Sequence, residues 1–187
     1  MPRDLPSFCR PRGGQAQIAR AQIALDASRH AGYTDDPQEI INYAFKHDNQ
    51  TLWDNNQYKL PEGTPAADRV RAQNLGVAAI TLGQGVPFFH AGGELLRSKS
   101  MDRDSYDSGD WFNELDYSRQ SNKWRVGLPI ADKNETNWPI ISGIFQDAST
   151  SVSAPDIEQS FEHFKEVLAI RKSSNLFRLR DANQINQ

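Results

Sequence analysis

The sequence is poor in several features that would assign a class of protein at once. It has a single cysteine, Cys9, in 187 residues, which excludes a framework of internal disulfides and leaves the compartment unknown. It has no apolar run of about 18 residues, the length that a transmembrane helix needs, and residues 1–14 lack the apolar core of a secretory signal. The formal charge is −3, so no basic excess is available to hold a phosphate backbone. We therefore expect neither a membrane nor a nucleic acid partner.

The length fits one ordinary domain, but the share of hydrophobic residues is low. Hydrophobic residues make up 37% of the chain and the mean hydropathy is −0.69, which allows a core without indicating a large closed one. Residues 1–30 are unusual, with five arginines against two aspartates. Residues 1–14, rich in Pro, Gly and Arg, predict coil, and the Ala- and Gln-rich residues 15–28 predict a helix with a weak apolar face.

The centre of the chain has the order of a parallel sheet. Residues 40–45 and 86–90 are short apolar runs, typical of strands buried on both faces, and residues 68–82 between them predict a helix. Because parallel neighbours need a crossover, this order predicts an α/β fold. On the helix we expect one apolar face, with Arg69 and Arg71 outside it, formed by Val70, Leu75, Val77, Ala78 and Leu82.

Two further segments stand out. Residues 98–155 are a long polar stretch with three of the four tryptophans, which we interpret as one functional loop. Residues 155–172 predict a helix that begins near Pro155. Its apolar stripe is expected to include Ile157, Phe161, Phe164, Val167, Leu168, Ile170 and Arg171.

The first candidate site follows the first strand. His47, Asp48 and Asn49 come directly after it, and ligand sites of parallel α/β folds lie beyond the carboxyl ends of the strands. A charged carboxylate is not needed there for packing, which favours a chemical role. The alternative is that Asp48 caps a turn and that His47 is an ordinary hydrogen-bond donor.

The second candidate site is residues 97–113, which combine arginines, aspartates and aromatic rings. Aromatic faces and planar polar groups suit a neutral polyhydroxyl ligand. A solvated charged loop and a calcium loop are the alternatives, although the aspartate spacing does not fit an EF-hand. The four histidines lack the spacing of zinc ligands, so we expect no structural zinc site, whereas a calcium site of another type stays open.

At this point the chain resembles a known family through long blocks of sequence. GYTDDPQEIINY (residues 32–43) and KHDNQTLWD (46–54) resemble the fourth conserved region of the pullulanase-type debranching enzymes. QGVPFFHAGGELLRSKSMDRDSYDSGDWFN (84–113), VGLP (126–129) and RKSSNLFRL (171–179) continue the resemblance in order. These α-1,6-glucosidases, or limit dextrinases, belong to the α-amylase superfamily, glycoside hydrolase family 13.

The resemblance implies a (β/α)8 barrel followed by a β-sandwich, and retaining hydrolysis of α-1,6 branch linkages in pullulan, amylopectin and limit dextrins. Of that fold we expect only the last two strand–helix units, with a long eighth βα loop. Asp48 would stabilise the transition state, and His47 would donate a hydrogen bond to the same sugar ring. The implied substrate-binding residues are Asn49, Arg103, Asp104, Tyr106 and Trp111.

The departures from the family are as informative as the matches. The nucleophile motif of the Asp-Gly-Phe-Arg-Phe-Asp type and the acid motif around Gly-Glu-Gly-Trp do not occur in this sequence. We therefore expect residues 1–31 to be an atypical segment, 32–180 to be the C-terminal portion of the barrel, and 181–187 to be a truncated tail.

These departures leave three hypotheses about the chain. It is an inactive portion of the hydrolase, a truncated product or one half of a split enzyme, or a protein that only binds starch-like glucans. The expected partners are a branched α-glucan and the missing N-terminal part of the barrel. No cofactor is required, and calcium is not assignable.

Overall fold

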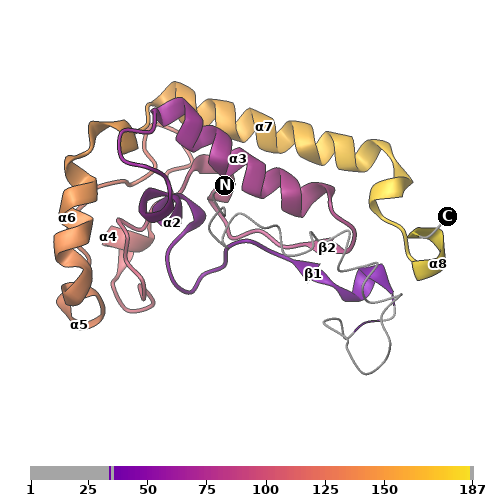
Figure 1. Cartoon of the computed structure of the whole chain (residues 1–187), viewed down its shortest axis with the longest axis horizontal. Helices are drawn as coiled ribbons and strands as arrows, with labels where there is room; N and C mark the ends of the chain where they lie inside the picture. The colour runs from indigo at the N-terminus through magenta and orange to yellow at the C-terminus, as the bar shows by residue number, and fades with distance from the viewer. Residues whose placement is uncertain (1–33, 35, 186–187) are drawn as a thin grey trace, which may run out of the picture.

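The structure, a computed structural model, describes residue 34 and residues 36–185 (Figure 1). The predicted coil and helix of residues 1–31 lie outside the described residues. Within the described part, no helix has the length and apolar character needed to cross a membrane.

The sheet consists of two parallel strands, β1 (Ile41–Asn42) and β2 (Val86–Pro87). Asn42 pairs with Pro87, and the backbone N–H of Val86 donates to the carbonyl of Ile40 at 2.8 Å. Parallel pairing with a helical crossover is thus confirmed. The strands are shorter than the predicted runs 40–45 and 86–90, because each pairs with a single described neighbour.

The expectation that both strands are buried on both faces is wrong. Helices cover one face of the sheet in Figure 1. On the other face, four large side chains are about half exposed in the described structure: Ile41, Tyr43, Val86 and Phe88. The apolar runs therefore mark a sheet that needs cover on its second face, and the described residues do not supply it.

The crossover contains two helices, α2 (Leu52–Lys59) and α3 (Ala66–Leu82). The predicted helix 68–82 is confirmed as α3. α2 was not predicted, because its sequence is polar and its start depends on a cap: the Thr51 hydroxyl accepts a hydrogen bond from the N–H of Asp54 at 3.1 Å.

The predicted face of α3 is partly wrong. Leu75 is 71% exposed, whereas Arg69 is 1% exposed and Ile80, outside the predicted set, is buried. The buried residues of α3 follow the helical period, and they include polar side chains that find partners: Arg69, Val70, Gln73, Asn74, Val77, Ile80 and Thr81.

Helix α7 (Ala154–Ser173) confirms the predicted helix 155–172. A capping box between Ser153 and Asp156 begins it, and it packs along α3 (Figure 1). Phe45, Val77, Ile80 and Val167 form a shared buried cluster. Leu168 and Ile170, which were expected in the stripe, are each 39% exposed, because their helical positions flank the face that Ile157, Val167 and Arg171 bury.

The long stretch 98–155 is not one loop, contrary to prediction. It contains α4 (Asp110–Asn113), α5 (Ala131–Asn134) and α6 (Trp138–Gln146). α6 begins with Pro139 at a first-turn position and buries Ile141. Short 3-10 turns complete the chain: η2 (Pro37–Glu39), η3 (Gly93–Leu95), η4 (Glu135–Asn137), η5 (Ala148–Thr150) and η6 (Asn175–Phe177), followed by α8 (Ala182–Ile185).

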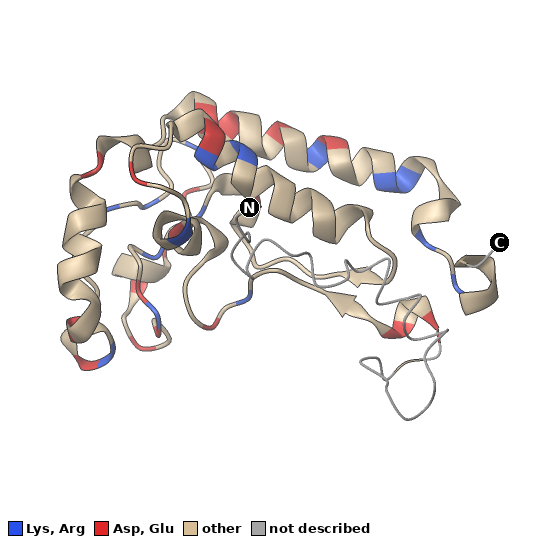
Figure 2. Ribbon diagram, viewed as in Figure 1, with Lys and Arg blue, Asp and Glu red and all other residues tan. Residues whose placement is uncertain are grey.

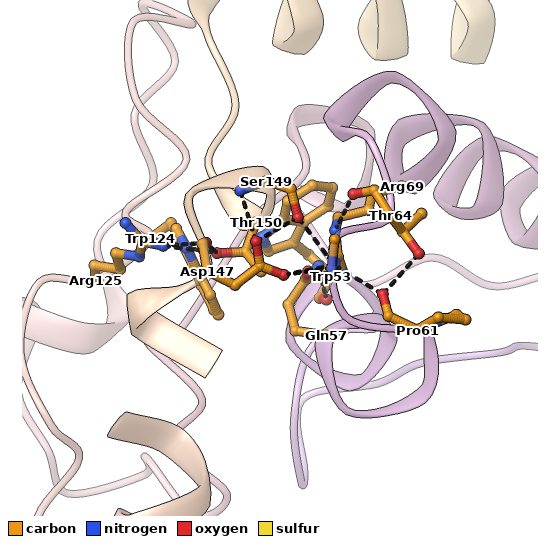
Figure 3. A network of polar contacts seen from close by, with 11 residues as sticks. Trp53, Gln57, Pro61, Thr64, Arg69, Trp124, Arg125, Asp147, Ser149 and Thr150 are labelled. Atoms are coloured by element: carbon orange, nitrogen blue, oxygen red, sulfur yellow. Dashed lines mark hydrogen bonds and ion pairs between the residues drawn. The ribbon is translucent and has the colours of Figure 1, made fainter. Parts of the chain in front are cut away.

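A buried arginine joins the crossover to this stretch (Figure 3). Arg69 donates to the side chain of Gln57 at 2.9 Å and to the carboxylate of Asp147 at 3.2 Å. It also donates to the Thr64 carbonyl at 3.0 Å and to the Ser149 hydroxyl at 3.3 Å. The buried guanidinium is therefore fully engaged, and it fixes the end of α6 against α2 and α3.

The described chain is thus helix-rich around a two-stranded parallel sheet. Two strands do not by themselves form a barrel, so the place of these strands in a (β/α)8 fold is a proposal.

Candidate functional site

The loop of residues 46–50 follows the carboxyl end of β1 and leads into α2. It carries the predicted site residues His47, Asp48 and Asn49. The segment that follows β2 leads to His90, so both strands deliver polar residues to one end of the sheet. Figure 2 shows charges of both signs on the loop between β1 and α2 and on the loop before α4.

Asp48 has an exposed, ionised carboxylate. Its side chain is 54% exposed, the Lys46 ammonium donates to one of its oxygens, and Nδ1 of His47 lies 3.2 Å from the other. The Lys46 hydrogen bond, with the charges of His47, Lys46 and Lys99, holds the pKa of Asp48 below its usual range, against a smaller desolvation effect. This carboxylate therefore keeps its negative charge under ordinary conditions.

Two adjoining cavities surround Asp48. One, of about 390 Å³, is lined by Asp48, Asn49, Arg103, Asp104 and Lys133. The other, of about 190 Å³, has these lining residues: His47, Asp48, His90, Arg97, Lys99, Asp104, Ser105, Tyr106 and Asn113. Asp48 and Asp104 line both cavities and thus mark the boundary between them.

The structure therefore brings together six of the seven predicted site residues: His47, Asp48, Asn49, Arg103, Asp104 and Tyr106. The seventh, Trp111, does not line either cavity. Its ring is 65% exposed, and its indole N–H donates to the Val126 carbonyl at 2.8 Å.

Asp102 and Asn134 fix the backbone that presents Arg103 and Asp104. Asp102 is fully buried, and its carboxylate accepts hydrogen bonds from the N–H of Asp104 at 3.0 Å and from the Asn134 amide at 3.1 Å. The side-chain amide oxygen of Asn134 accepts a hydrogen bond from the backbone N–H of Arg103 at 3.1 Å. Sequence reasoning missed Asn134, because no local pattern links it to a residue 32 positions earlier.

The deep wall of the smaller cavity is basic. Burial lowers the pKa of His90 to about 4, helped by the charges of Arg97, Lys99 and His47. Nε2 of the neutral ring lies 3.0 Å from one guanidinium nitrogen of Arg97. The other terminal nitrogen of Arg97 donates to the backbone carbonyl of Asn113 at 2.8 Å. His90 is thus a hydrogen-bond acceptor in this wall.

Asp54 and Lys99 form a second support that sequence reasoning missed. The fully buried Asp54 carboxylate accepts from the Ser98 hydroxyl at 2.5 Å and from the N–H of Lys99 at 2.8 Å. Burial raises the pKa of Asp54 to about 6, and these hydrogen bonds oppose the rise. The Lys99 ammonium donates to the carbonyl of His47 at 3.1 Å.

The site is suited to a neutral ligand rich in hydroxyl groups. Carboxylates accept from hydroxyls, arginine and lysine donate to them, and an aromatic ring offers an apolar face. In residue 34 and residues 36–185, no group of three or more His, Cys, Asp or Glu side chains is arranged to hold a metal ion.

Comparison with known proteins finds that this chain is similar to part of several pullulanases. A family model described as alpha-1,6-glucosidases, pullulanase-type, C-terminal, matches residues 119–187. Pullulanase 1, chloroplastic, of Arabidopsis thaliana is 45% identical over 171 residues, which cover 91% of this chain and 18% of the relative. Pullulanase of Klebsiella aerogenes is 47% identical over 150 residues, covering 80% of this chain and 14% of the relative.

Solved structures agree with these relatives. Apo pullulanase from Klebsiella pneumoniae superposes with a TM-score of 0.79 at 41% identity, over 88% of this chain and 18% of that one. A structure of Klebsiella pneumoniae pullulanase complexed with maltotriose gives the same TM-score and identity, over 88% of this chain and 16% of that one. The chain thus spans less than a fifth of the length of these relatives.

Proposed function

Because the chain belongs to the pullulanase-type α-1,6-glucosidase family, we propose that it forms part of a glycoside hydrolase that cleaves α-1,6 branch linkages in α-glucans. The substrate class is that of pullulan, amylopectin and limit dextrins. One observation of this chain carries the proposal: six residues from two distant segments line two adjoining cavities at one end of a parallel sheet.

Each residue has a role that its geometry supports. The ionised Asp48 holds sugar hydroxyls and stabilises positive charge that develops on the ring in an oxocarbenium-like transition state. His47 donates a hydrogen bond to the same ring. Asn49, Arg103 and Asp104 bind the neighbouring sugar from the larger cavity, and Tyr106 offers its ring to a sugar face, with Trp111 further out.

We propose that β1 and β2 are the seventh and eighth strands of a (β/α)8 barrel within residues 32–180, and that residues 181–187 follow it. Three features support this. The strands are parallel, helices cover one face, and the other face exposes four large apolar side chains. In such a barrel the exposed face lies inside, where side chains from further strands cover it.

Retaining hydrolysis needs a nucleophile and an acid/base carboxylate besides Asp48. The family motifs that carry them do not occur in these 187 residues. We therefore propose that the chain supplies the transition-state carboxylate and the sugar-binding residues, and that the part of the barrel outside these 187 residues supplies the other two carboxylates. In an experiment, a complementing polypeptide with both motifs can take the place of that part.

The test measures reducing-sugar release from pullulan and binding of maltotriose by the purified 187-residue chain. We expect binding without turnover, and turnover when a polypeptide with the nucleophile and acid motifs is co-expressed. Asp48→Asn in that pair should remove turnover, as loss of one member of a catalytic set does. Turnover by the chain alone would contradict the division of roles, and binding that complementation never converts to turnover would favour a glucan-binding protein.

A further inference from the structure

The loop that presents Asp48 has little support of its own. Within the described part of the chain, the backbone of residues 46–50 makes one hydrogen bond to another element, from the Lys99 ammonium to the carbonyl of His47 at 3.1 Å. The side-chain contacts of Asp48 come from Lys46 and His47 of the same loop, both exposed. Asn49 has a left-handed backbone with φ 59°, a conformation that is uncommon outside glycine although asparagine tolerates it better than most residues. Local interactions alone therefore do not determine this conformation.

Lys99 is itself rigidly placed. Its side chain is 2% exposed, its N–H donates to Asp54 at 2.8 Å, and the neighbouring Ser98 hydroxyl donates to the other oxygen of Asp54. Asp54 lies in the first turn of α2, directly downstream of the loop. The contacts thus close a ring that runs from the loop into α2, across Asp54 to Lys99, and back to His47.

The chemistry of position 99 points to a use for the charge. A buried ammonium loses its hydration, and burial lowers the pKa of Lys99 while the nearby carboxylates of Asp54 and Asp102 raise it. A methionine would fill similar space without that cost. Among the described residues the ammonium donates its hydrogen bond to the His47 carbonyl, with the Asp54 and Asp102 carboxylates nearby, so the charge serves to hold this backbone group.

We propose that Lys99 is a positioning residue of the candidate site. Its ammonium holds the His47 carbonyl and so fixes the backbone from which the Asp48 carboxylate reaches both cavities. The identity of the sugar ligand rests on the proposed function, whereas the tether is a property of this chain.

The first experiment measures backbone order by ¹⁵N relaxation in the full chain and in Lys99→Met, Lys99→Arg and Lys165→Met. Lys165 is an exposed lysine on α7 and gives a matched control. In Lys99→Met we expect order parameters of residues 47–50 to fall from about 0.85 to below about 0.6, while α3 and α7 stay rigid. Lys99→Arg, which keeps a charged donor, should retain the order, and Lys165→Met should change nothing. Unchanged order in folded Lys99→Met would overturn the proposal, as would equal loss in Lys99→Arg.

The second experiment needs no variant and decides the case in which Lys99→Met fails to fold. The Lys99 ammonium protons should exchange slowly with water and show a coupling across the hydrogen bond to the His47 carbonyl carbon. Ammonium protons that exchange as fast as those of Lys165 would overturn the tether.

The third experiment titrates maltotriose into the same proteins. Loss of a charged hydrogen bond that positions the site should weaken binding about tenfold in Lys99→Met, and much less in Lys99→Arg. If the parent chain binds no maltotriose, the proposed function fails for this chain, and the relaxation result still decides the tether. Equal affinity of Lys99→Met and the parent would overturn the positioning role.

Discussion

Two titratable residues, the fully buried Asp54 and the partly buried His90, respond to pH in opposite directions. The folded-state pKa of Asp54 is raised to about 6, so the stability it contributes is complete below its unfolded value near 3.8 and is lost as the pH rises through about 6. The folded-state pKa of His90 is lowered to about 4, so its contribution is complete above the unfolded value of 6.5 and is lost as the pH falls toward 4. Between these limits the two effects oppose each other, and the fold is buffered against pH.

Replacing Asp54 by a residue that does not ionise should remove its share of the pH dependence of stability and leave that of His90. In Asp54→Asn the amide oxygen still accepts from Lys99 and the amide can donate to Ser98, but nothing ionises. We expect the unfolding free energy at about pH 8 to rise relative to the parent by about 1.4 kcal/mol when both are referenced to about pH 5, because about one pKa unit of the shift acts above pH 5. Urea unfolding at both pH values measures this, with Asp107→Asn at an exposed aspartate as control. A parallel pH dependence in parent and variant would contradict the pKa of Asp54.

The two aromatic residues predicted for the site, Tyr106 and Trp111, differ in placement, which gives a second prediction at the residue scale. Tyr106 lines the smaller cavity, whereas Trp111 lines neither. Tyr106→Ala should weaken maltotriose binding by about tenfold, and Trp111→Ala by clearly less. Calorimetric titration of the two variants gives the comparison, and a larger effect at Trp111 would show that sugars bind outside the two cavities.

At the scale of elements, helix α3 shows what packing adds to a sequence pattern. Val70 and Val77 were correctly assigned to its buried face, but Leu75 points to solvent and Arg69 points inward. The arginine is inside because distant partners, at Gln57 and Asp147, satisfy its guanidinium (Figure 3). A hydrophobic pattern carries no information on such partners.

Two truncations of aliphatic side chains can test which face of α3 is buried. Ile80 is 2% exposed and Leu75 is 71% exposed on the same helix. Ile80→Ala should lower the unfolding free energy by about 2–4 kcal/mol through lost burial and a cavity, and Leu75→Ala by less than about 0.5 kcal/mol. Urea unfolding distinguishes them. Comparable losses would restore the face predicted from sequence.

Some elements and site residues of this chain follow from local sequence patterns, and others depend on contacts between distant residues. α3, α7 and the parallel pairing follow from local periodicity and from the order of apolar runs. Helices α2 and α6 were not predicted. α2 depends on a cap at Thr51, and α6 is a short apolar helix within a stretch that is otherwise polar. In the site, family motifs identified His47, Asp48 and Arg103 directly. The supports, Asp54 with Lys99 and Asp102 with Asn134, join positions 45 and 32 residues apart, and no local pattern reports such distant pairs.

At the scale of the whole molecule, the described chain has two different surfaces. Helices α3 and α7 pack on one face of the sheet, and Ile41, Tyr43, Val86 and Phe88 remain exposed on the other. Tyr43 and Phe88 meet edge to face at 6.4 Å, so the rings form a contiguous apolar patch with the two aliphatic residues. A contiguous exposed apolar patch of this kind indicates a protein–protein contact surface, as the proposed barrel requires.

A charge placed on this patch should block complementation without harming the chain. Ile41 is 59% exposed, so Ile41→Lys should change the unfolding free energy by less than about 1 kcal/mol. Inside a closed barrel, however, an unpaired ammonium costs several kcal/mol, so co-expression with the complementing polypeptide should yield no pullulan hydrolysis. Leu75 on α3 is also well exposed, at 71%, so Leu75→Lys is the matched control and should support hydrolysis. Equal hydrolysis by the two variants would show that this face does not lie inside a barrel, because the lysine would then remain in water.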